Sequence, residues 1–286
     1  MRRWLIGLFS VVLSSALSAQ TIVWITDDQR DEVALTSHEP FSIGVDTVKL
    51  VMKSLPQYHF DIRVASVSGI DKELFTNPNA CVANRLKNSE RQSRNYFSQP
   101  LNLHLGPRLY FLKNRTVIPP QLIDANGKLT SIHLLLSQKP RVVLGLASDA
   151  SYGKRWDAEL HKATKEGISM FSVDNRYDTN AMLLSNQMVD LIVDYPTQIK
   201  HQIAQHNLSE SEIESISLAG APEFLVTYIA CSKSEIGAKF IEDVNQTLSN
   251  LYETNDFLKA HTLHIDQSTV PAFKTNLNQV LKEQKN

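Results

Sequence analysis

The stretch RVVLGLASDASYGKRWDAELHKATKEGISMFSV, residues 141–173, contains a strand, a helix and a second strand in direct succession. Arg141 to Ala147 is an apolar run with the length of a buried strand, and Gly167 to Val173 is another. Between them, Ser151 to Glu166 has the spacing of a helix that ends at Gly167. Strands that alternate with helices in this way predict an α/β protein with mostly parallel sheets.

The same alternation extends in both directions along the chain. It predicts strands at 21–25, 60–67 and 189–193, and helices at 45–54, 178–187, 199–206, 235–251 and 256–260. Two strand-like segments, at 108–112 and 225–231, separate a central set of elements from an outer set. We therefore predict two lobes with two crossovers, the first formed by residues 20–110 plus 226–286 and the second by residues 111–225.

The first 19 residues have the pattern of a secretory signal peptide. Arg2 and Arg3 supply positive charge, Leu5 to Leu17 is an apolar run, and small residues allow cleavage after Ser18 or Ala19. The alternative is an uncleaved membrane anchor, but the run is short and rich in Ser. We therefore expect an exported, periplasmic protein, and no later stretch is long and apolar enough to suggest a membrane helix.

The charge balance argues against two classes of partner. The formal net charge is -1, and both signs are mixed along the chain. Such a surface lacks the basic footprint of a nucleic-acid-binding protein and the polybasic patch of a membrane-surface protein. We expect a monomer whose partner is a small molecule, and no nucleic acid.

The two cysteines, Cys81 and Cys231, allow one disulfide in an oxidising compartment. The alternative is a pair of buried thiols, because free cysteine packs as a small apolar residue. Two cysteines are too few for a zinc site, and the nine histidines are scattered without ligand spacing. We expect no metal and no cofactor.

The stretch SERQSRNYFSQP, Ser89 to Pro100, resembles the ER…FS.P segment of family 3 extracellular solute-binding proteins, the polar amino-acid receptors of ABC importers. Three further stretches resemble the family in the same order: Leu144–Gly153, Val189–Pro196 and Tyr228–Lys233. The resemblance extends over nearly the whole predicted mature chain. It implies a two-lobed fold of the type II periplasmic-binding-protein kind, with two hinge strands and a ligand cleft between the lobes.

The resemblance also implies roles for two charged residues. It places Arg91 in the ligand pocket, where a guanidinium fork matches a carboxylate in bidentate fashion. It places Asp194, at the end of a strand, where it accepts hydrogen bonds from a ligand ammonium. The alternatives are a surface arginine on a helical turn and a turn residue before Pro196.

Four uncharged residues complete the predicted binding site. Ser148 and Ser151 precede a helix whose free N–H groups can bind an anion, although Asp149 can simply cap that helix. Trp24 can stack on a ligand, and Asn88 stands near the position where relatives place a hydroxyl. The resemblance further implies that the strands carrying Cys81 and Cys231 are neighbours.

The sequence lacks the common catalytic motifs: G-x-S-x-G, H-E-x-x-H, a phosphate-binding loop and a dinucleotide fingerprint. We therefore expect a non-enzymatic receptor that captures a small polar, amino-acid-like solute for import through an ABC permease. One alternative is a ligand sensor that signals to a membrane partner. A second is a dehydratase on the same fold, for which Asp27, Asp28 or Glu90 is a candidate acid.

Overall fold

The computed structural model describes residues 19–138, 141–148, 150–163, 167–171, 179–206, 208–209, 211–265, 267 and 269–283. Residues 1–18, which form nearly all of the predicted signal peptide, lie outside the described residues. Within the described part, no helix has both the length and the apolar character needed to span a membrane.

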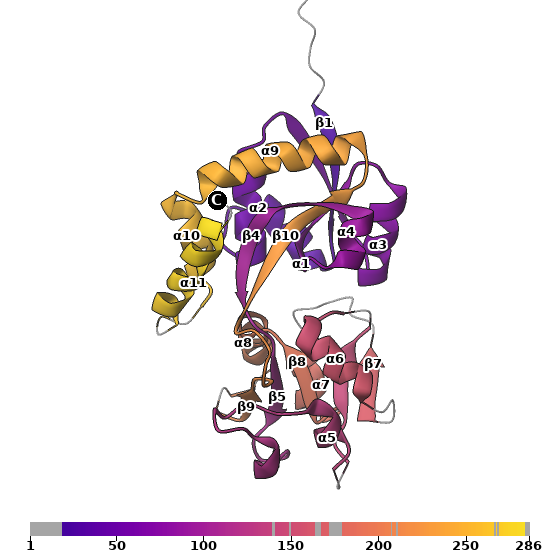
Figure 1. The fold of residues 1–286 in the computed structure, drawn as a ribbon, viewed down its shortest axis with the longest axis vertical. Coiled ribbons are helices and arrows are strands. Elements are labelled where there is room, and N and C mark those ends of the chain that lie inside the picture. Colours follow the sequence, from indigo (N-terminus) through magenta and orange to yellow (C-terminus); the bar gives the residue numbers. More distant parts are fainter. Residues whose placement is uncertain are drawn as a thin grey trace, which may run out of the picture.

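Two five-stranded sheets, each flanked by helices, form two lobes that are stacked along the longest axis of the molecule (Figure 1). The first sheet has the order β2-β1-β3-β10-β4. Its strands are β1 (Gln20–Thr26), β2 (Tyr58–Val64), β3 (Ala80–Arg85), β4 (Asn95–Leu105) and β10 (Phe224–Ser232). Strand β1 contains the apolar run Ile22–Ile25, which is buried. This is expected of a strand that has a neighbouring strand on each side.

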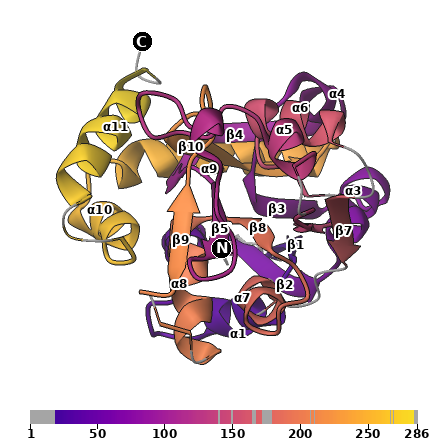
Figure 2. The same cartoon turned by 90° about the horizontal axis from the view of Figure 1, so that it is seen from below.

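The second sheet has the order β7-β6-β8-β5-β9. Its strands are β5 (Arg108–Leu112), β6 (Leu144–Ala147), β7 (Ile168–Phe171), β8 (Leu191–Asp194) and β9 (Ile213–Ile216). The two lobes overlie one another when the molecule is viewed from below (Figure 2).

The α/β class and the two lobes are confirmed, but the prediction of mostly parallel sheets is wrong. In the first sheet β1 runs parallel to β2 and β3, whereas β10 runs antiparallel to β3 and β4. In the second, β6 runs parallel to β7 and β8, whereas β5 runs antiparallel to β8 and β9. The antiparallel strands, β10 and β5, are those that enter their sheet from the other lobe. The sequence pattern of a strand does not show in which direction it runs relative to its neighbours.

The helices cover both sheets. They are α1 (Gln29–Thr36), α2 (Ile43–Lys53), α3 (Val67–Thr76), α4 (Ser89–Arg94), α5 (Ile132–Leu136), α6 (Lys154–Lys162), α7 (Thr179–Ser185), α8 (Pro196–Gln205), α9 (Glu235–Leu251), α10 (Asn255–Thr262) and α11 (Val270–Glu283), with a 3-10 turn at Pro120–Leu122. Helix α9 has the predicted bounds. Helix α6 begins three residues later than predicted, because Gly153, at φ 99°, forms its N-cap.

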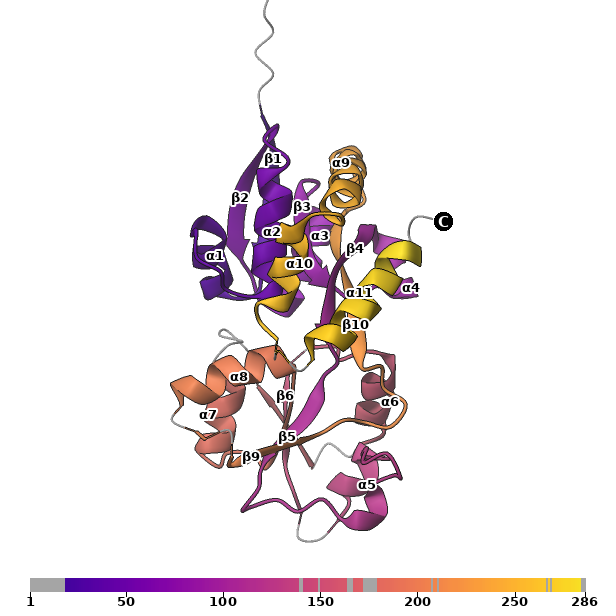
Figure 3. The same ribbon diagram turned by 90° about the vertical axis from the view of Figure 1, so that its left-hand side faces the viewer.

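The core of the first lobe forms where two amphipathic helices meet the sheet. Ser234 caps α9, and this helix buries Phe240, Val244 and Leu248 at helical spacing. The Phe240 ring meets Trp24 of β1 edge-on, with centroids 6.5 Å apart. Helix α11 packs beside β4 at the side of this lobe (Figure 3).

The two crossing segments touch one another between the lobes. The Gly106 N–H donates to the Glu223 carbonyl at 2.7 Å. A Cβ at Gly106 would lie 2.4 Å from the Pro222 carbonyl oxygen, so only glycine permits this approach. Because β5 lies wholly in the second sheet, the chain changes sheets at Gly106–Pro107 and not within the predicted segment 108–112.

Cys81 and Cys231 form a disulfide, as the sequence allows. The two residues are paired across β3 and β10, and both side chains are fully buried. The bond links positions 150 residues apart in the chain, so it restricts the unfolded ensemble strongly.

We predict that replacing both cysteines (Cys81→Ala with Cys231→Ala) lowers the free energy of unfolding by about 2–5 kcal/mol, because the unfolded chain regains the entropy of a long loop. Urea denaturation of the variant and the wild type measures the difference. Equal midpoints and slopes would show that the bond contributes nothing to stability. Oxidised and reduced wild-type protein, compared in the same way, provides the control.

A buried carboxylate organises the second lobe. Glu159 of α6 is 4% exposed at its side chain, and it forms ion pairs with Arg155 at 2.8 Å and Lys162 at 3.1 Å. It also accepts hydrogen bonds from the Ser131 hydroxyl at 2.7 Å and the Ile132 N–H at 3.2 Å. Burial acts to raise the pKa of Glu159, but the hydrogen bonds from Ser131, Arg155 and Lys162 outweigh it and lower the pKa to about 2.

Because this pKa is depressed on folding, the stabilisation is complete above the unfolded pKa of about 4.3 and is lost as pH falls toward 2. We predict that Glu159→Gln lowers stability by roughly 1–3 kcal/mol at pH 7 and by clearly less at pH 3. Urea unfolding at both pH values measures the two differences. A difference that does not depend on pH would contradict the ionic role of Glu159.

Candidate functional site

A cavity of about 460 Å³ lies between the lobes and takes its lining from both of them. The first lobe contributes the carboxyl ends of β1 and β3 and the first turn of α2. The second contributes the ends of β6 and β8 and the start of α7. Ligands of open α/β sheets gather beyond the carboxyl ends of strands, so the cavity has the position expected of a binding site.

Arg91 lies on α4, at the first-lobe side of this cavity. The Asn88 side chain caps the helix by accepting from the Arg91 N–H at 2.8 Å. The Arg91 guanidinium donates from Nη1 to the Leu86 carbonyl at 3.1 Å, which holds it near the end of β3. Among the described residues, no carboxylate lies within ion-pair distance of Arg91. The other arginine of α4, Arg94, pairs with Glu90.

Asp194 lines the same cavity from the second lobe, and it is only 3% exposed. One carboxylate oxygen accepts from Asn180 Nδ2 at 2.8 Å and from Gln202 Nε2 at 2.9 Å, and the other accepts from the Tyr195 N–H at 2.6 Å. These donors on α7 and α8 fix the orientation of the carboxylate. Its negative charge adds to the effect of burial in raising the pKa of Tyr110 and of Tyr152 above the usual range.

Of the six predicted binding residues, four line the cavity: Trp24, Arg91, Ser151 and Asp194. Trp24 is 2% exposed and packs against Phe60 and Phe240, so it forms part of the wall. The Ser151 hydroxyl donates to Asp157 Oδ2 at 2.7 Å, which shapes the loop before α6.

The remaining two predicted residues are not among the described residues that line the cavity. Asn88 is exposed and serves as the cap of α4. Ser148 donates its backbone N–H to the Phe171 carbonyl at 2.9 Å in the turn after β6. Asp149, the alternative helix cap, lies outside the described residues.

The end of β3 brings two polar residues to the cavity that sequence reasoning missed. Asn84 has a left-handed backbone with φ 57°. Arg85 is 7% exposed and forms an ion pair with Asp71, while its Nε atom is buried without a partner. Burial, together with the nearby charge of Arg91, lowers the pKa of Arg85. The short apolar run Ala80–Ala83 was a signal for the strand, but it does not show that the two residues after it reach the cavity.

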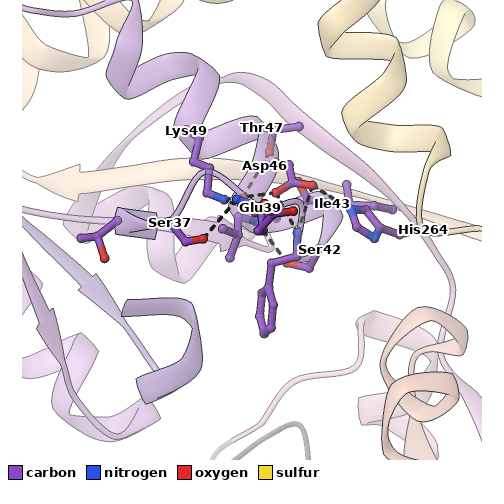
Figure 4. Close-up of polar contacts among 12 residues, drawn as sticks. Ser37, Glu39, Ser42, Ile43, Asp46, Thr47, Lys49 and His264 are labelled. Atoms are coloured by element: carbon purple, nitrogen blue, oxygen red, sulfur yellow. Dashed lines mark hydrogen bonds and ion pairs between the residues drawn. The ribbon is translucent and has the colours of Figure 1, made fainter. Parts of the chain in front are cut away.

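The first turn of α2 forms another edge of the cavity (Figure 4). Ser42 caps the helix by accepting from the Val45 N–H at 3.2 Å. The Asp46 carboxylate accepts from the Phe41 N–H at 3.0 Å and contacts His264 Nε2 at 2.7 Å. This contact fastens α2 to the segment after α10, where Leu263 and His264 also line the cavity.

The arrangement has a definite chemistry. Arg91 offers bidentate donors to an anionic group, and Asp194 offers a carboxylate to a cationic one. The two stand on different lobes and line one cavity. A molecule with both charges can therefore contact both lobes at once.

No protein-family model matches the sequence, and no curated protein is significantly similar to it. Solved structures are similar in fold. An ancestral arginine-binding protein bound to arginine superposes with a TM-score of 0.62 at 16% identity, covering 87% of this chain and all of its own (100%). A putative L-cystine ABC transporter protein from Listeria monocytogenes gives 0.63 at 16% identity, covering 87% of this chain and 97% of its own.

A third similar structure is a histidine kinase sensor domain with similarity to periplasmic binding proteins. It gives a TM-score of 0.62 at 13% identity and covers 87% of this chain and 97% of its own. Identities this low establish the architecture alone. The chain therefore has the two-lobed fold of the type II periplasmic-binding-protein kind, over nearly the full length of each of these structures.

Proposed function

We propose that the protein is an exported receptor that captures a small zwitterionic, amino-acid-like solute between its lobes and delivers it to an ABC importer. The observation that carries the proposal is the position of Arg91 and Asp194 on opposite lobes of one cavity. The ligand's carboxylate binds Arg91 and its ammonium binds Asp194, so the ligand extends from one lobe to the other. Binding then favours the closed arrangement of the lobes.

The energetics suit reversible capture. Each charge-assisted hydrogen bond to the ligand contributes about 1.5–3 kcal/mol net. Several such bonds, less the cost of immobilising a small molecule, give micromolar or tighter affinity. No covalent step is needed, and the proposed role is binding without catalysis.

The similar structures support the same reading. The arginine-binding protein and the cystine transporter protein have amino acids as ligands, and their fold covers 87% of this chain. Residues 1–19, as a cleavable signal peptide, would direct the protein to the periplasm, where such receptors act.

A second candidate is a sensor that presents its ligand-bound form to a membrane partner. The similarity to the histidine kinase sensor domain favours it. Capture of the ligand is the same in both cases, and only the partner differs. Uptake of labelled solute by cells that lack the gene separates the two, since a transport receptor is needed for uptake and a sensor is not.

The direct test is calorimetry of the purified protein with the twenty proteinogenic amino acids, L-cystine and glutathione. We expect at least one zwitterion to bind with a 1:1 stoichiometry. The matching amine without its carboxylate, and the N-acetylated acid without its ammonium, should each bind at least tenfold more weakly. Absence of binding by every compound, or equal binding of the blocked analogues, would contradict the proposal.

We predict that Arg91→Ala lowers the affinity for the bound amino acid at least tenfold, because the ligand carboxylate loses its guanidinium partner. Arg94→Ala is the matched control, since Arg94 is exposed on the same helix and pairs with Glu90. It should leave affinity unchanged. Similar melting temperatures without ligand would show that both variants fold, and equal affinities of the two variants would remove Arg91 from the site.

A further inference from the structure

A group of four polar residues lies where the two crossing strands leave the first lobe. We call Asn84, Asn102, His104 and Thr227 the hinge cluster. Asn84 is near the end of β3, Asn102 and His104 are on β4, and Thr227 is on β10. Strand β4 continues to the crossing at Gly106, and β10 begins at the other crossing.

The side-chain oxygen of Asn84 lies at the centre of the hinge cluster. Its Oδ1 atom accepts from Asn102 Nδ2 at 2.8 Å. His104 Nε2 lies 3.3 Å from the same atom, and the Thr227 hydroxyl lies 3.4 Å from it. The side-chain oxygen of Asn84 therefore lies within reach of groups from both crossing strands, and the amide is oriented with this oxygen toward them.

Two features of the backbone accommodate Asn84 at this place. Its φ of 57° is a left-handed conformation, which is uncommon for a residue other than glycine although asparagine tolerates it. Across from it, a Cβ on Gly44 of α2 would lie 2.3 Å from Asn84 Nδ2, so the absence of a side chain there makes room for the amide. Strained conformations that the surrounding structure maintains tend to occur at functional positions.

The other end of the amide, Nδ2, lies beside Gly44 of α2, and both residues line the cavity. Among the described residues, none accepts a hydrogen bond from Asn84 Nδ2, and this atom is not one of those sealed from solvent without a partner. Asn84 lines the cavity together with Gly44, His104 and Thr227. The side chain thus presents a donor to the cavity and an acceptor to the strands.

We infer that Asn84 is a positioning residue that couples ligand to hinge: Nδ2 donates to an oxygen of the bound solute, while Oδ1 holds β4 and β10. The part of the inference that concerns the ligand rests on the proposed function. A ligand carbonyl or carboxylate oxygen fixes the amide. The fixed amide then favours one arrangement of the two strands about which the lobes move.

Two substitutions separate the two ends of this amide. Asn84→Asp keeps an acceptor for the strands but replaces the donor with a second oxygen, which repels a ligand oxygen. Asn84→Gly suits the left-handed backbone and removes both ends. Gln187→Gly is the matched backbone control, because Gln187 is the other described non-glycine residue with φ 57°.

Distances between the lobes are measured with spin labels on Phe75→Cys in the first lobe and Val117→Cys in the second. These side chains are 81% and 79% exposed, and both native cysteines are held in the disulfide. Without ligand, we expect the distance distribution to broaden in Asn84→Gly and to stay as in the wild type in Asn84→Asp and Gln187→Gly. L-Arginine and L-glutamine are then tested as ligands. For each one that the wild type binds, we expect the affinity of Asn84→Asp to be at least tenfold lower than that of the wild type.

The inference is overturned if Asn84→Asp binds the wild-type ligand within twofold of the wild-type affinity. It is also overturned if the ligand-free distribution of Asn84→Gly matches that of Gln187→Gly. If the wild type binds neither of these two, the amino acid found by the calorimetric screen takes their place, and absence of binding by every compound of that screen would count against the proposed function instead. In that case the ligand-free distributions still decide whether Asn84 holds the strands.

Discussion

The contact between the two crossing segments constrains every other feature of the molecule. A backbone hydrogen bond joins Gly106 to Glu223, and the absence of a side chain at Gly106 lets the segments approach. Two segments that touch at one place define an axis, and under the proposed function the lobes open and close about it. The cavity lies beside this axis, and the relative position of its two walls is therefore set by a few backbone dihedral angles.

A disulfide and an aromatic core hold the strands of the first lobe together. The disulfide binds β3 to β10, and β3 also carries Asn84 and Arg85 to the cavity. The fully buried Phe240, packed edge-on against Trp24, adds the rigidity of an aromatic core. Under the proposed function, the pairing of β3 with the crossing strand β10 is the route by which a ligand contact at the end of β3 reaches the hinge.

The sequence predicted the parts of the fold that depend on apolar periodicity. Helix α9 has its predicted bounds, and the apolar run before Asp194 is the buried strand β8. Strands β3 and β4 were not predicted from the sequence. In β4, polar residues such as Asn102 interrupt the apolar pattern, and Asn102 is buried with a partner, Asn84, that a distant strand supplies. The resemblance led to Arg91 and Asn88, and Asn84 was not among the predicted site residues. A choice between two asparagines depends on strand pairing, which local pattern does not encode.

Arg91 and Asp194, two of the charged residues that line the cavity, are oriented by hydrogen bonds within the protein. The Leu86 carbonyl holds the guanidinium of Arg91, and Asn180, Gln202 and the Tyr195 N–H hold the carboxylate of Asp194. Ordering side chains on binding costs about 0.5–1.5 kcal/mol for each flexible group, and fixed groups avoid that cost. Under the proposed function, most of the free energy of the ligand contacts then remains available to shift the lobes from open to closed. Under the proposed function, charged groups fixed on separate lobes and a hinge that Asn84 biases allow the shape of the receptor to report that its cavity is occupied.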